Sequence, residues 1–133
     1  MVSAGVRFIT HDASFVVLNR LGKGRFPEEV GCIEVMDNVY IGYNATIMPN
    51  VKIGENVIIG AGALVSKDLE PNGIYVGIPA RKICSFDDYV ERHSENMAGG
   101  GGYSFPYVQR NQSISNDEVK RAWKFFEDGR SID

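Results

Sequence analysis

Two histidines are the side chains in this 133-residue sequence that are best suited to move a proton near neutral pH, because an imidazole titrates in that range. His11 stands in the segment Phe8-Ile-Thr-His-Asp-Ala-Ser, where it can act as general base toward a hydroxyl or an amine. It can equally be a turn residue that hydrogen-bonds the backbone, and the residues alone leave both readings open. His93 lies among charged residues and is expected on a solvated helix face.

A run of small residues is followed by cationic side chains that suit a phosphate-bearing ligand. Gly60 to Ala63 are all glycine or alanine, Ser66 and Lys67 come next, and Arg81 follows a Pro-Ala pair. Small residues let an extended ligand lie close to the backbone, and Lys and Arg donate hydrogen bonds to phosphate. Lys67 and Arg81 can also be ordinary solvated charges, and the sequence keeps both options.

The elements that must position these residues form a repeat with a period of six. Branched aliphatic residues recur in one frame, at Val35, Ile41, Ile47, Ile53, Ile59 and Val65. Small or aliphatic residues stand two places before each of them, at Ile33, Val39, Ala45, Val51, Val57 and Ala63, with Leu69 after them. Residues that tolerate turn or left-handed backbone stand three places after each, at Asn38, Asn44, Asn50, Asn56, Gly62 and Asp68. The pattern predicts short strands alternating with tight corners.

The repeat predicts a three-sided coil. Because side chains alternate along a strand, the residue at the repeat position and its partner two places earlier both point inward. Three sides of six residues close a triangle, so eighteen residues make one coil. Stacked coils then place Val35 under Ile53, Ile41 under Ile59 and Ile47 under Val65, which is a β-helical solenoid with aliphatic ladders inside.

Residues 33–68, together with the closing segment Pro71-Asn-Gly-Ile-Tyr-Val-Gly-Ile-Pro-Ala-Arg-Lys-Ile, resemble the hexapeptide-repeat acyltransferases. The resemblance implies an all-β fold, a left-handed parallel β-helix solenoid with a protruding loop and a C-terminal helical tail. It also implies transfer of an acetyl group from acetyl-CoA to a hydroxyl or amine of a sugar, nucleotide-sugar or similar small polar acceptor. A homotrimer is implied as well, because in the family coenzyme A lies between adjacent subunits.

The same resemblance assigns roles to particular residues. His11 matches the family's general base. Ala61, Ser66 and Lys67 match positions that line the pantetheine groove, and Arg81 matches a basic residue near the nucleotide phosphates. One further residue, Tyr40, matches a position that walls the acetyl or acceptor pocket, although packing between subunits is an equal alternative for it.

Two segments lie outside the regular repeat. Phe8 fits the inward frame, but Val35 lies 27 positions after it, which is not a multiple of six. We therefore expect a loop over about residues 12–31 that leaves the solenoid, returns to it and packs on a neighbour. Its basic residues suggest an anionic acceptor. A β-helix domain over residues 1–83 is expected to precede a tail, 84–133, with helices at about 85–95 and 116–127, each opened by a capping serine.

Composition narrows the function classes further. The net charge of −3 disfavours nucleic acid as the main partner. No apolar run reaches the roughly 18 residues of a membrane helix, and no signal peptide is visible. Two distant cysteines, Cys32 and Cys84, favour a reducing compartment, hence the cytoplasm. A zinc hydratase built on the same solenoid needs three histidine ligands, and only two histidines exist, so no metal is expected.

Two functions remain at this stage. One is the acetyl-CoA-dependent acetyltransferase with His11 as its base. The other is a non-catalytic hexapeptide-repeat scaffold that assembles as a trimer and needs neither His11 nor a coenzyme A groove.

Overall fold

A computed structural model of the chain describes residues 1–99 and 115–128. The chain divides into two units, Met1–Glu91 and Arg92–Asp133, and each is described by itself. The sequence placed the division earlier, after residue 83. The first turn of the following helix stays with the strands because the Phe86 N–H donates to the Asn72 carbonyl oxygen at 3.2 Å.

Six short strands carry the six-residue repeat of the first unit. They are β4 (Ile33–Val35), β5 (Val39–Ile41), β6 (Thr46–Ile47), β7 (Val51–Ile53), β8 (Val57–Ile59) and β9 (Leu64–Val65). They pair in three parallel ladders, β4 with β7, β5 with β8 and β6 with β9. The predicted stacking of Val35 on Ile53, Ile41 on Ile59 and Ile47 on Val65 is confirmed by these registers.

An earlier level of the same ladders comes from the N-terminal segment. Strand β1 (Arg7–Phe8) lies parallel to β6, with Phe8 opposite Ile47, and Val2 forms a parallel bridge to Ile41. Phe8 therefore occupies the inward position that its place in the repeat predicted. The Arg7 N–H donates to the Ala45 carbonyl oxygen at 2.9 Å, in the manner of the other levels.

The corners between strands use left-handed backbone, as their residue types predicted. Asn38, Asn44, Asn50 and Asn56 have φ between 53° and 61°, and Gly62 has φ 70°. Asparagine tolerates this region because its short polar side chain can bond locally. Here the corner side chains also bond each other: the Asn38 amide donates to Asn56 Oδ1 at 2.7 Å, and the Asn56 amide donates to Asn72 Oδ1 at 2.9 Å.

The last level departs from the predicted frame. Asp68 is not among the residues with left-handed backbone, and Leu69 pairs with Ile53 rather than with Val51. In the regular levels a strand N–H donates to a backbone carbonyl of the next level. At this level the Lys52 N–H instead donates to Asp68 Oδ1, at 2.8 Å. A side-chain oxygen that replaces a backbone oxygen lets the chain close this level with two residues fewer.

Two longer strands follow the repeat. Strand β10 (Gly73–Val76) lies parallel to β8, and β11 (Arg81–Ser85) runs back antiparallel to β10. They are connected through a cis peptide bond between Ile78 and Pro79.

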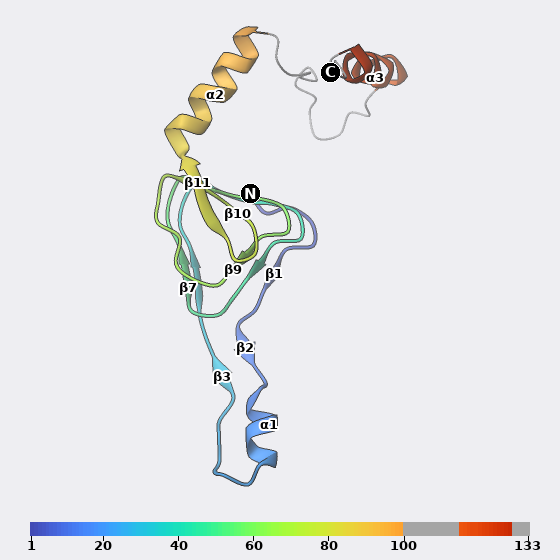
Figure 1. Ribbon diagram of the computed structural model, residues 1–133. Coiled ribbons are helices and arrows are strands. Elements are labelled where there is room, and N and C mark those ends of the chain that lie inside the picture. Colours follow the sequence, from blue (N-terminus) through green and yellow to red (C-terminus); the bar gives the residue numbers. More distant parts are fainter. Residues whose placement is uncertain (100–114, 129–133) are drawn as a thin grey trace. The chain divides into compact units, whose positions relative to one another are not determined.

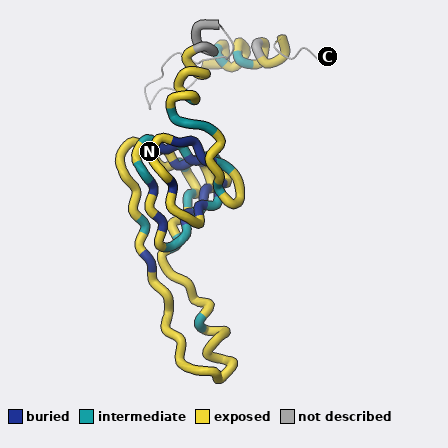
Figure 2. The backbone as a smooth tube through the Cα atoms, turned by 60° about the vertical axis from the view of Figure 1, so that its left-hand side comes forward, coloured by how far each residue is buried: buried dark blue, intermediate teal, exposed yellow. Residues whose placement is uncertain are grey.

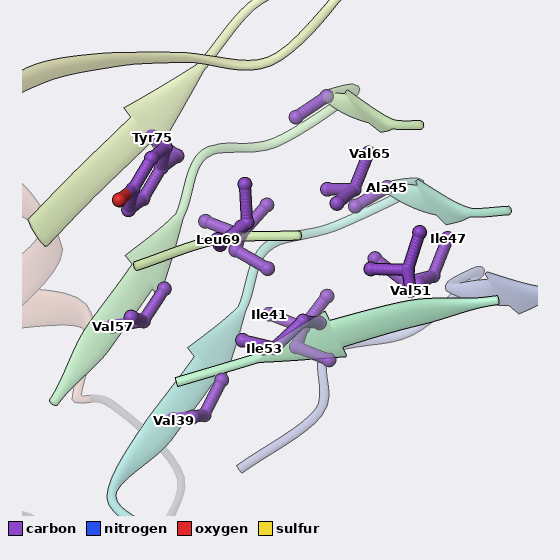
Figure 3. Packing of buried hydrophobic residues seen from close by; sticks show 12 residues of the cluster. Val39, Ile41, Ala45, Ile47, Val51, Ile53, Val57, Val65, Leu69 and Tyr75 are labelled. Carbon is purple, nitrogen blue, oxygen red and sulfur yellow. The ribbon is translucent and has the colours of Figure 1, made fainter. Parts of the chain in front are cut away.

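The core lies between the ladders and is wholly apolar. The buried residues are Val39, Ile41, Ala45, Ile47, Val51, Ile53, Val57, Ile59, Ala63, Val65, Leu69, Ile74 and Tyr75, together with the glycines Gly31, Gly42 and Gly73. Figure 3 shows side chains of this cluster converging from different strands. Val35 is 40% exposed because β4 has a paired strand on one side only.

The interruption of the repeat forms an arm, defined here as residues 11–30. It leaves the strands through β2 (His11–Asp12), continues through helix α1 (Phe15–Arg20) and returns through β3 (Glu29–Val30). Strand β3 pairs antiparallel with β2. The arm extends away from the strands in Figure 1 and is almost entirely exposed in Figure 2. No residue of α1 is buried.

Two helices follow the strands. Helix α2 spans Phe86–Gly99 and α3 spans Asn116–Asp128, and each has a serine at its start. Ser85 Oγ accepts the Asp88 N–H at 3.1 Å. Ser115 and Glu118 form a reciprocal capping box, whose hydrogen bonds hold the pKa of the Glu118 carboxyl below its usual value. None of the described helices is both long and apolar enough to cross a membrane.

Candidate active site

His11 lies at the root of the arm, on strand β2, and not in a turn. It pairs with Val30 on the returning strand, so its backbone is extended. The root is closed by the Gly31 N–H, which donates to the Thr10 carbonyl oxygen at 2.8 Å. The arm thus holds His11 immediately beside the strands.

Gly31 permits this close return of the chain. A Cβ added at Gly31 would lie 2.7 Å from Pro49 Cβ and 2.6 Å from Asn50 Oδ1. Real Cβ atoms do not approach other atoms so closely, so any other residue here would push the returning strand away from the β6–β7 corner.

A hollow of about 540 Å³ lies beside His11. Three parts of the chain line it: the arm root, the corner between β6 and β7, and the end of β9. The lining residues are Ile9, His11, Asp12, Ala13, Glu29, Val30, Gly31, Met48, Pro49, Asn50 and Ser66. We call this the histidine hollow.

Asp12 follows His11 directly, but its carboxylate has a local role. Asp12 Oδ1 accepts the Ser14 N–H at 2.7 Å, a bond that shapes the start of α1. Asp12 therefore has a partner of its own at the turn into α1.

A second hollow, of about 170 Å³, contains the predicted cations. Its lining residues are Ser66, Lys67, Asp68, Leu69, Tyr75, Ala80, Arg81 and Lys82. We call this the cationic hollow. Ser66 lines both hollows, so the structure places Ser66 with His11 in one of them and with Lys67 and Arg81 in the other.

Tyr75 gives the cationic hollow a buried wall. Its hydroxyl donates to the Glu70 carbonyl oxygen at 2.8 Å. Burial raises the pKa of the Tyr75 hydroxyl, and the nearby Glu70 carboxylate adds to that rise. This phenol therefore stays neutral and fixed at physiological pH.

Two predicted residues lie elsewhere in this chain. Tyr40 accepts a hydrogen bond from Ser3 Oγ at 3.0 Å and lines a third hollow, of about 400 Å³, with Met1, Met36 and Phe86 among its neighbours. Ala61 is exposed at a corner and lines none of these three hollows. The single chain does not bring Tyr40 or Ala61 together with Ser66 and Lys67.

The sequence reasoning missed Glu29, Met48 and Asn50 as lining residues. For Glu29 a signal existed: a loop that leaves and rejoins a solenoid must bring its two ends together, so residues near 30 lie beside those near 11. For Asn50 the corner of the repeat explained the residue type and hid the second role. Met48 departs from the repeat, at a position where a small residue is usual. Among the described residues, no group of three or more His, Cys, Asp or Glu side chains could hold a metal ion.

Comparison with known proteins supports the class of repeat seen here. Residues 33–67 match the family model described as bacterial transferase hexapeptide, six repeats. The chain is 45% identical over 56 residues to the galactoside O-acetyltransferase of Escherichia coli, which covers 42% of this chain and 28% of that protein. These matches confirm the resemblance to the hexapeptide-repeat acyltransferases.

Solved structures agree with this assignment. A maltose O-acetyltransferase from Clostridium difficile superposes with a TM-score of 0.54 and 37% identity, over 64% of this chain and 44% of that one. A hexapeptide-repeat-containing acetyltransferase from Vibrio cholerae, solved with acetyl-CoA, superposes with a TM-score of 0.53 and 28% identity. The match covers 61% of this chain and 43% of that one. The chain thus spans less than half the length of each of these three proteins.

Proposed function

We propose that this protein transfers an acetyl group from acetyl-CoA to a hydroxyl or amine of a sugar, nucleotide-sugar or similar small polar acceptor. The observation that carries the proposal is the position of Ser66, which lines both the histidine hollow and the cationic hollow. The proposed base and the cations proposed to bind the phosphates of coenzyme A thus line hollows that share Ser66. The pantetheine arm could then carry the thioester from one hollow toward the other, where the acceptor must meet it.

His11 is the general base of this proposal. A sugar hydroxyl or amine in the histidine hollow is a weak nucleophile until its proton is removed, and an imidazole is suited to remove it near neutral pH. When bound, acetyl-CoA supplies a thioester whose C–S bond breaks as the acceptor bonds to the acetyl carbon. His11 takes the acceptor proton and then returns it to the departing sulfur.

The cationic hollow fits the anionic end of coenzyme A. Lys67, Arg81 and Lys82 line it against a single carboxylate, that of Asp68. Lys and Arg bind phosphate through charge-assisted hydrogen bonds. At about 170 Å³ the hollow holds a phosphate-sized part of the ligand, so the pantetheine arm would lie outside it, along the surface toward Ser66.

We infer that the three ladders form one left-handed parallel β-helix. The eighteen-residue registers of Val35 with Ile53 and Ile41 with Ile59 support this architecture. The left-handed asparagine corners support it too, because they turn the chain sharply between one ladder and the next.

A homotrimer in the cytoplasm completes the proposal. The exposed aliphatic side chains of the arm, with Val17 at 62% and Leu21 at 59%, need a covering surface. A neighbouring copy would provide that surface and would bring Tyr40 and Ala61 to a second chain's site. The free thiols of Cys32 and Cys84 favour a reducing compartment.

The testing experiment measures acetyl-CoA binding by calorimetry and molar mass by light scattering on the same sample. We expect one site per chain in a trimer, with Lys67→Ala weakening binding about tenfold, as loss of a charged hydrogen bond would. Lys23→Ala, on the arm and outside the cationic hollow, is the matched control. A folded trimer that binds no acetyl-CoA would support the scaffold instead.

Acceptors are then screened by release of coenzyme A, beginning with galactosides and maltose, the sugars named for the similar enzymes. Binding of acetyl-CoA without transfer to any sugar or nucleotide-sugar would contradict the proposed acceptor class.

A further inference from the structure

The two adjoining hollows carry opposite charges. Two acids, Asp12 and Glu29, line the histidine hollow together with His11, and no lysine or arginine is among its lining residues. The cationic hollow has Lys67, Arg81 and Lys82 against Asp68. The acceptor therefore meets a negative surface in the hollow where the proposed base lies.

Glu29 is the carboxylate available to an acceptor. It lies directly opposite Asp12 in the β2–β3 pair. Asp12 is engaged by the Ser14 N–H, whereas the Glu29 carboxylate has no hydrogen bond or ion pair with any residue that the structure describes. Two like charges placed opposite each other across a strand pair are unfavourable. A hydrogen-bond donor or a positive charge in the hollow relieves this repulsion, and a further negative charge increases it.

The cations of the arm do not change this balance. Arg20, Lys23 and Arg25 made the loop basic and suggested an anionic acceptor, but none of the three lines the histidine hollow. They belong to the part of the arm beyond the β2–β3 pair, from the last residue of α1 onward.

We propose that Glu29 is a specificity-determining residue that selects acceptors whose reacting end is neutral or cationic and disfavours those whose reacting end is anionic. The inference rests on the proposed function for its setting, because it describes the acceptor of that site. It predicts a preference for amino sugars and neutral sugars over uronic acids of the same ring.

The test compares three sugars that share a ring and differ in charge: galactosamine with its amine protonated, galactose and galacturonate. Binding to the wild-type chain is measured by NMR titration. We expect affinity to fall in that order, by about twofold to fivefold at each step, the range for an exposed charge pair. Glu29→Gln should reduce both steps, while Glu28→Gln, which removes the same charge one residue outside the lining, should leave them unchanged.

Transfer is measured separately with the same three sugars and acetyl-CoA. Galacturonate that binds as tightly as galactose, a Glu29→Gln variant with unchanged selectivity, or a chain that binds none of the three sugars would each overturn the role of Glu29. Transfer without the charge order overturns this inference and leaves the proposed function standing. The expected charge order without transfer overturns the proposed function and leaves the charge selectivity of the hollow standing.

Discussion

The strand ladders and the arm carry similar aliphatic residues but bury them to opposite extents. Ile53, in β7, has none of its surface exposed, whereas Leu21, just after α1, is 59% exposed. The ladders bury their side chains because each level covers the one before it. The arm is a single excursion with no second level, so it exposes its apolar residues and holds His11 at its root. Stability thus resides in the repeat, and the proposed chemistry in the interruption of the repeat.

The largest effect should come from the arm root. His11→Ala is expected to lower turnover at least a hundredfold, because general-base catalysis typically contributes that much, while acetyl-CoA affinity stays unchanged. Steady-state kinetics and calorimetry check the two parts. His93→Ala, in α2, is the matched control and should retain wild-type turnover. A His11→Ala enzyme within tenfold of wild type would show that His11 is not the base.

A substitution in the core of the ladders should lower the free energy of unfolding much more than one in the arm. Ile53→Ala removes a fully buried side chain and is expected to cost about 2–5 kcal/mol, measured by urea unfolding. Leu21→Ala, on the arm, should cost less than about 0.5 kcal/mol in a dilute monomeric sample. A comparable loss for both variants would mean that the arm is part of the cooperative core.

Gly31 tests how strictly the ladders position the arm. Gly31→Ala forces a Cβ to within 2.7 Å of Pro49 Cβ, and overpacking of this kind costs about 1–3 kcal/mol. We expect turnover to fall because the returning strand shifts and carries His11 with it. Gly62→Ala, where nothing lies within 4 Å of the added Cβ, controls for simple crowding. Its own cost comes from the left-handed backbone, with φ at 70°. Unchanged turnover in Gly31→Ala would show that the arm adjusts freely.

The smallest effect is expected at a corner, where two variants separate the contribution of the left-handed backbone from that of the side-chain hydrogen bonds. Asn56 has φ 53° and bonds the side chains of Asn38 and Asn72. Asn56→Gly leaves the left-handed backbone unstrained and removes the two exposed side-chain hydrogen bonds. We therefore expect the free energy of unfolding to fall by about 1 kcal/mol or less. Asn56→Ala should lose about 1 kcal/mol more, because alanine is strained in this region. Equal unfolding free energies for the two variants would contradict a role for the left-handed corner.

Much of the strand unit was predictable because its rule is local and repeated. The residues three places after each inward aliphatic position, from Asn38 to Gly62, predict the corners, and the six aliphatic positions predict the ladders. The frame failed at Asp68 and Leu69, where one side-chain oxygen replaces a backbone oxygen. Aspartate tolerates left-handed backbone much as asparagine does, so its type did not predict the change. The difference lies in the hydrogen bond from the Lys52 N–H, on the preceding level.

The candidate site also has a part that the sequence predicted and a part that it did not. His11, Lys67 and Arg81 were identifiable from their chemistry and from the resemblance they carry, and Tyr40 and Ala61 were named with them. That Ser66 joins two hollows, and that Tyr40 and Ala61 lie apart from it, depends on long-range registers. The charge of the histidine hollow depends on Glu29 returning beside Asp12. The basic composition of the loop pointed to the opposite acceptor charge.

The amino-acid sequence by itself determined the period of six, the inward aliphatic positions and the asparagine corners, because backbone tolerance and side-chain alternation belong to each residue and its nearest neighbours. The tertiary structure alone decided the shortened last level, the exposure of the arm and the placement of His11 and Ser66 around one hollow. Those features join residues that are sixteen or more positions apart, as Leu69 is from Ile53. Their distances follow from how the levels stack and where the interruption returns, which no single residue specifies.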